Sequence, residues 1–202
     1  MSKIFIIIGK SATGKDTIFK RLLEAKELDL KSVVGYTTRP IRSGETDGLE
    51  YYFVSQDRLK ELTEEDKVIE HRVYPTVHGL WHYFTVNDGQ IDLNRSDYLL
   101  IGTLEAYEQI RNYFGRDAVI PIYIEVEDGL RLKRALHREQ KQEKPRYKEL
   151  CRRYLADEED FSEENLKKLD IRKRYQNVDI NICLYQIIND IKDINGRDEF
   201  TV

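Results

Sequence analysis

Several features are scarce in this chain of 202 residues, and each scarcity excludes a class of protein. Its two cysteines, Cys151 and Cys183, match no metal-ligand spacing and form no disulfide framework, which indicates a reducing compartment. No apolar run approaches the roughly 18 residues that cross a membrane, and the amino terminus does not read as a secretory signal. A formal net charge of −4 excludes a broad basic surface for nucleic acid. We therefore expect a cytoplasmic protein that binds neither membrane nor nucleic acid.

Hydrophobic residues make up 40% of the chain and charged residues 35%, which is typical of a globular protein with a heavily charged surface. The length suffices for one substantial core and is short for two independent domains. We expect a single domain with inserted segments.

The most informative stretch is Ile4–Thr17, which reads IFIIIGKSATGKDT. Residues 4–8 form a short apolar, β-branched run, as expected of a strand buried on both faces of a parallel sheet. Gly9 and Gly14 bracket four residues, and Lys15 follows directly. This is the G-x-x-x-x-G-K spacing of a loop that wraps nucleotide phosphates.

The residue types of this loop suit phosphate chemistry. The glycines allow backbone conformations that turn successive N–H groups onto phosphate oxygens, and Lys15 adds a positive charge. A helix expected from Asp16 to Lys26 would direct its positive end at the same place. The residues assigned to nucleotide phosphates in this stretch are Gly9, Lys10, Ser11, Ala12, Thr13, Gly14, Lys15, Asp16 and Thr17.

One position departs from the loop pattern. Asp16 stands where the pattern has a serine or threonine that contacts Mg²⁺, and the hydroxyl comes one residue later, at Thr17. A carboxylate can bind Mg²⁺, so Asp16 is either a substitute ligand or a helix-start residue turned away. Asp16 and Thr17 are the candidate metal ligands.

The rest of the chain alternates predicted strands and helices. Strands are expected at 32–35, 51–54, 67–74, 75–85, 98–101, 119–126 and 180–184. Helices are expected at 57–65, 104–114, 129–141, 147–158 and 185–194. Strand, helix and strand at these lengths indicate a parallel sheet with helices on both faces. The acidic run 157–165 reads as a solvated face or a mobile tip.

A dense motif at 37–55, TTRPIRSGETDGLEYYFVS, follows the expected second strand. Together with the phosphate loop, Glu70, Tyr83, Thr85 and the arginine-rich later helices, it resembles the guanylate kinase family over nearly the whole chain. The resemblance implies that Arg39, Arg42, Tyr51 and Tyr83 hold the phosphate of a nucleoside monophosphate. Planar guanidinium forks and phenol hydroxyls suit phosphate oxygens.

The resemblance also assigns the remaining site residues. Glu70 matches a glutamate that reads guanine through its N1–H and amino group, and Thr85 and Thr103 are assigned to the same acceptor site. Lys15, Arg39 and three arginines of the later helices are assigned to catalysis: Arg134, Arg138 and Arg153. Asn181 matches a residue near the adenine of ATP. The sequence does not predict a metal site at His78 and His82, because no carboxylate or thiol is near in sequence.

Departures from the family concern base recognition. Gly35 replaces a serine, and Leu100–Thr103 replaces an aspartate-rich segment. The resemblance implies GMP as the acceptor, ATP as the donor and Mg²⁺ as the cofactor. Two alternatives stay open: a kinase for another nucleotide or phosphorylated acceptor, and a non-catalytic module of the same fold that binds a protein.

The expected fold is an α/β, P-loop NTPase-like parallel sheet flanked by helices. We expect a core at 1–33, 95–129 and 170–202, a β-rich flap for the monophosphate at 34–94, and a helical lid at 130–169. The protein would act as a monomer or homodimer.

Overall fold

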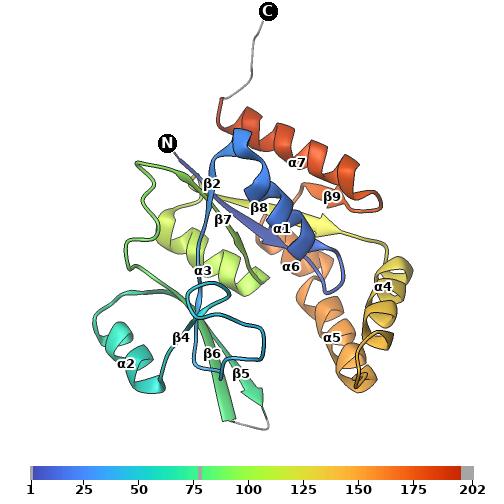
Figure 1. Ribbon diagram of the computed structural model, residues 1–202. Helices are drawn as coiled ribbons and strands as arrows, with labels where there is room; N and C mark the ends of the chain where they lie inside the picture. The colour runs from blue at the N-terminus through green and yellow to red at the C-terminus, as the bar shows by residue number, and fades with distance from the viewer. Residues whose placement is uncertain (1, 77–78, 197–202) are drawn as a thin grey trace, which may run out of the picture.

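The structure is a computed structural model that describes residues 2–76 and 79–196. Its core is a five-stranded parallel sheet in the order β2-β7-β1-β8-β9 (Figure 1). The strands are β1 (Ile4–Ile8), β2 (Leu30–Ser32), β7 (Asp97–Ile101), β8 (Val119–Glu125) and β9 (Arg174–Gln176). The central strand β1 is fully buried, as its unbroken apolar run predicts.

Helices cover both faces of this sheet (Figure 1). Two of them, α1 (Lys15–Glu24) and α7 (Ile180–Ile194), pack with the 3-10 turn η1 (Lys26–Leu28) around Phe5 and Ile7. On the other face, α3 (Leu104–Phe114) and α6 (Glu163–Lys168) pack around Ile4 and Ile6. The alternating sides of β1 thus supply two separate cores.

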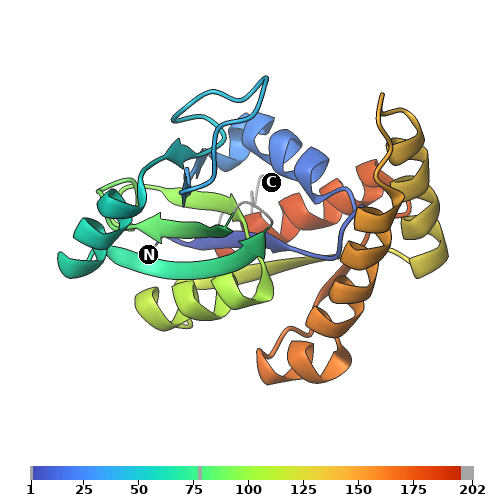
Figure 2. The same cartoon turned by 90° about the horizontal axis from the view of Figure 1, so that it is seen from below.

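A second sheet, of order β4-β3-β6-β5, forms the flap. Its strands are β3 (Tyr36–Thr37), β4 (Tyr52–Phe53), β5 (Val68–Thr76) and β6 (Gly79–Val86), and α2 (Gln56–Glu64) packs on it. Two long helices, α4 (Asp128–Gln140) and α5 (Tyr147–Asp160), form the lid. Flap and lid stand on opposite sides of the loop that follows β1 (Figure 2).

The predicted α/β architecture is confirmed, and two predicted strands are wrong. Residues 180–184 form the start of the last helix and not a strand. The Asp179 side chain caps this helix, because it accepts hydrogen bonds from the N–H groups of Asn181 and Ile182. The last strand is β9, which ends three residues before that cap. Of the expected strand at 32–35 only Ser32 lies in a strand, because β2 ends there and β3 begins at Tyr36.

Candidate active site

The loop between β1 and α1 needs its glycines where the sequence places them. A Cβ on Gly9 would lie 2.6 Å from the carbonyl oxygen of Ile124, and Gly9 has a φ of 155°. Gly14 has a φ of 88°, and a Cβ there would lie 2.5 Å from the Asn177 amide nitrogen. Glycine is therefore fixed at both ends by close packing and by backbone conformation.

Lys15 keeps its charge available inside this loop. Its Nζ contacts the carbonyl oxygen of Lys10 at 3.4 Å, and it forms no ion pair within the described residues. Burial lowers the pKa of Lys15, and the negative charges of Asp16 and Asp157 partly oppose that shift. A partly buried ammonium group without a carboxylate ion-pair partner favours an anionic ligand.

Asp16 and Thr17 lie exposed in the first turn of α1, next to Lys15. Their oxygen atoms are the donor type that Mg²⁺ takes, so they fit that ion. Within residues 2–76 and 79–196, no three histidine, cysteine or acidic side chains gather closely enough to hold a metal ion. A magnesium ion at Asp16 and Thr17 would therefore need phosphate oxygens as further ligands.

In the flap, Arg39 is almost fully buried and already paired. Its Nη1 and Nη2 donate to the Glu45 carboxylate at 2.7 and 2.6 Å, and its guanidinium lies over the Tyr51 ring at 5.3 Å. The Arg39 fork lowers the pKa of Glu45 to about 2. The Arg39 Nε is buried without a hydrogen-bond partner. Glu45 thus occupies the guanidinium fork of Arg39, a fork whose geometry also suits phosphate oxygens.

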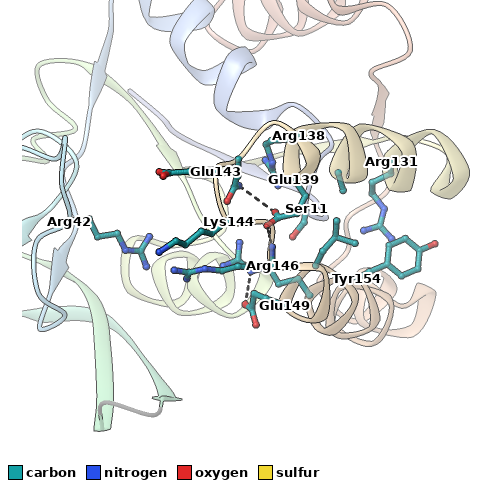
Figure 3. A pocket seen from close by; sticks show the side chains of 14 residues that line it. Ser11, Arg42, Arg131, Arg138, Glu139, Glu143, Lys144, Arg146, Glu149 and Tyr154 are labelled. Carbon is teal, nitrogen blue, oxygen red and sulfur yellow. Dashed lines mark hydrogen bonds and ion pairs between the residues drawn. The ribbon is translucent and has the colours of Figure 1, made fainter.

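The other predicted phosphate contacts lie beside Arg39. The Tyr51 and Tyr83 rings meet edge to face with their centroids 5.6 Å apart, and burial raises the pKa of Tyr51. Arg42 is exposed, and its side chain extends from the flap toward the lid (Figure 3). The structure therefore brings all four predicted residues to one region of the flap.

Glu70 is buried at 2% exposure and accepts hydrogen bonds from two neighbours. Arg72 donates from Nε and Nη2 at 2.9 and 3.0 Å, and the Thr85 hydroxyl donates at 3.0 Å. The sequence analysis did not predict Arg72 as a partner of Glu70. The available signal for this pair was the spacing of two residues on a strand, which puts both side chains on one face.

A cavity of about 530 Å³ lies between the lid, the loop and the flap (Figure 3). Its lining includes Ser11 of the loop, Arg42 of the flap, and the predicted lid arginines Arg138 and Arg153. Arg134 is not among its lining residues, because its Nη2 donates to the carbonyl oxygen of Asn177 at 3.0 Å. The cavity therefore gathers cations from the flap and the lid beside the loop.

A second cavity, of about 460 Å³, also borders the loop. Lys15, Thr103, Asp157 and the flap residue Tyr74 are among its lining residues. Thr103 also caps α3, since its hydroxyl accepts from the N–H of Ala106 at 3.2 Å. This residue thus faces the loop from the carboxyl end of β7.

The acidic run at 157–165 is not a uniformly solvated face, and that prediction is wrong at its start. Asp157 accepts from the N–H of Ser11 at 2.8 Å and from the fully buried Arg131 at 3.0 Å. Glu158 accepts from Lys10 at 2.7 Å and also pairs with Arg131. The lid helix α5 is thereby tied to the phosphate loop.

Asn181 lies exposed on α7, where its side chain accepts from Arg21 at 3.0 Å. Asn177 contacts the loop instead: it is buried, and its amide donates to the Thr13 carbonyl at 2.7 Å. His78 lies outside the described residues, and His82 contacts the ring nitrogen of His71 at 2.8 Å. Only tertiary packing could distinguish Asn177 from its neighbours.

The model of the guanylate kinase family matches residues 1–164. A guanylate kinase from Syntrophomonas wolfei is 34% identical over 121 residues, which are 59% of this chain and 60% of that protein. A guanylate kinase from Caldanaerobacter subterraneus is 44% identical over 77 residues, which are 38% of this chain and 37% of that protein. The matches thus span less than two thirds of these relatives.

The guanylate kinase from Anaplasma phagocytophilum superimposes with a TM-score of 0.61 at 21% identity, covering 99% of this chain and 88% of that one. That likeness concerns the fold. The aligned region includes the phosphate loop, the flap and the lid.

Proposed function

The chain belongs to the guanylate kinase family, and we propose that it transfers the γ-phosphoryl group of ATP to the phosphate of GMP, forming ADP and GDP. The observation that carries this proposal is the cavity shared by Ser11, Arg42, Arg138 and Arg153. Phosphoryl transfer depends on positioning and on cations placed where charge develops, so a cavity lined by arginines beside a phosphate loop suits it.

Each part of the chain would have one task. The loop at 9–17 would hold the ATP phosphates, with Lys15 beside the transferred group. Arg39, Arg42, Tyr51 and Tyr83 would hold the acceptor phosphate, with Arg39 exchanging Glu45 for it. No protein base is required, because the acceptor phosphate is already an anion.

The lid would supply the remaining cations. Arg138 and Arg153 would neutralise the charge on the moving phosphoryl group, and lid closure would exclude water that could hydrolyse ATP. The catalytic role of Arg134 and the adenine contact of Asn181 stay predictions. We assign the core to 1–33, 95–129 and 170–202, the acceptor flap to 34–94 and the lid to 130–169, of which the last helix, α6, packs on the core sheet.

Mg²⁺ is part of this proposal. Asp16 and Thr17 would hold the ion together with the nucleotide, and the ion would neutralise charge on the β- and γ-phosphates. The described residues contain no helix that is long and apolar enough to span a membrane. Cys151 and Cys183 are both free thiols, which supports a cytoplasmic location.

The test is ADP release from ATP and Mg²⁺ with GMP, dGMP, AMP, IMP, CMP, UMP or no acceptor. Turnover with GMP well above the other nucleotides is the expected result. Turnover with another acceptor would replace GMP in the proposal. ATP binding without turnover on any acceptor would contradict a kinase and favour the protein-binding module.

A further inference from the structure

The carboxylate of Glu70 is almost completely used by its own protein. Oε1 accepts from both Arg72 Nη2 and the Thr85 hydroxyl, and Oε2 accepts from Arg72 Nε. A carboxylate offers about four acceptor positions, so about one remains. A ligand that needs two hydrogen bonds from Glu70 must displace a partner that is already there.

The strand register builds this arrangement. Glu70 lies opposite Thr85 and Arg72 opposite Tyr83 on the paired strands β5 and β6. The two charged side chains are two residues apart on one strand, so they share a face. Tyr83 contacts Tyr51, which places the Arg72 fork next to the proposed phosphate contacts. The pair therefore belongs to the flap itself and does not depend on the lid.

The two N–H donors of Arg72 have the same arrangement as the two donors on one edge of guanine. Nε–H and Nη2–H are parallel and adjacent, and they meet both oxygens of a carboxylate. The N1–H and 2-amino N–H of guanine present the same pair of parallel donors. Hypoxanthine offers only its N1–H there, and adenine offers an amino group beside an acceptor nitrogen. Arg72 and guanine therefore cannot occupy the two Glu70 oxygens together.

We propose that Arg72 is a positioning residue that holds Glu70 in the empty acceptor site and competes with the guanine base for its carboxylate. The inference rests on the proposed function, since it takes a guanine nucleotide as the acceptor. Without a bound acceptor, Arg72 keeps the buried Glu70 carboxylate paired with a positive charge. The same contact weakens acceptor binding, because the fork must leave before guanine can form both of its hydrogen bonds.

The test substitutes Arg72→Met and measures the KM and kcat for GMP and IMP at saturating ATP and Mg²⁺. The KM for GMP is expected to fall by about tenfold, the scale of one charge-assisted hydrogen bond that no longer has to break. The kcat should stay unchanged, and the KM for IMP should fall less. Arg72→Lys keeps the cation without the planar fork, so it should lower the KM for GMP by a smaller factor.

The matched control is Arg58→Met, which removes an exposed arginine of the same flap that pairs with Glu61. GMP binding without ATP is followed in parallel by the fluorescence of the single tryptophan, Trp81 on β6. This second readout separates acceptor affinity from turnover.

Two results would overturn the inference. An unchanged KM for GMP in both Arg72 variants would mean that the base does not use the oxygens held by Arg72. An increased KM with a folded protein would make Arg72 a direct acceptor contact. Wild-type turnover that prefers a non-guanine acceptor would instead refute the proposed substrate, so the two failures are distinguishable.

Discussion

In both the flap and the phosphate loop, charged side chains pair with other side chains of the protein. The partners differ in how far apart they lie along the sequence. In the flap, Arg39 pairs with Glu45 six residues away, and Glu70 pairs with Arg72 two residues away. The loop's partners lie far off in the lid: Lys10 and Glu158 are 148 residues apart. The flap thus carries its partners with it, whereas the loop is paired only while the lid is near.

This difference predicts how each site is freed. A flap pair opens by a side-chain exchange within one small sheet, so acceptor binding needs only a competing ligand. The contacts between α5 and the loop open only when a helix moves. Lys15 belongs to neither arrangement, because it forms no ion pair within the part of the chain that the structure describes.

The largest effect is expected from Lys15→Met. It removes the loop cation that no internal carboxylate occupies, so the kcat for ADP formation should fall by about 100-fold or more. Lys20→Met, an exposed position on the same helix, is the control. Steady-state kinetics at saturating nucleotide measures the effect. A loss below threefold would show that Lys15 does not contact the transferred group.

The loop could be predicted because its signal is contained in neighbouring residues. Gly9, Gly14 and Lys15 define a conformation and a charge within one turn of chain. The pairing partners were missed because they depend on strand register and helix packing, as with Asp157 in an acidic run that reads as surface. The apolar run 180–184 was ambiguous, since a short run fits a strand or a helix, and the Asp179 cap decided it.

Glu45→Ala tests the local pairing of the flap. It leaves the buried Arg39 without a partner, so the free energy of unfolding should fall by about 2 kcal/mol. Glu61→Ala breaks an exposed arginine pair in the same flap and should cost about 0.5 kcal/mol or less. Urea denaturation compares the two. Equal losses of unfolding free energy would mean that the buried Arg39–Glu45 pair stabilises the protein no more than the exposed pair does.

Asp157→Ala tests the long-range pairing. Arg131 would keep Asp128 and Glu158, so the loss of unfolding free energy should be smaller, about 1 kcal/mol. ATP binding should tighten, because the Ser11 N–H becomes free for a phosphate oxygen. Calorimetric titration with ATP checks this, with the exposed Glu159→Ala as control. Weaker ATP binding would contradict the competition between Asp157 and phosphate.

The smallest expected effect is a pH dependence of the protein's stability that comes from one flap residue, His71. Burial, then the neighbouring His82, lowers the pKa of His71, so the unfolded chain binds its proton more readily than the folded one. Stability should therefore fall as the pH decreases below about 6.5, until His71 is protonated in the folded protein too. Urea denaturation of wild type and His71→Gln at pH 8 and pH 5.5 measures this. A wild-type pH dependence that persists fully in the variant would exclude His71 as its source.

The hydrogen bond between the Asn177 amide and the Thr13 carbonyl oxygen has a consequence for when the loop can fold during synthesis. The glycine and lysine residues of the loop leave the ribosome first, but the amide that supports the loop from behind is 164 residues later. Strand β8, whose Ile124 carbonyl limits Gly9, also follows more than 100 residues after it. A nascent chain therefore carries the phosphate-binding sequence long before it has the support for that loop, and the loop gains that support only after Asn177 has been made.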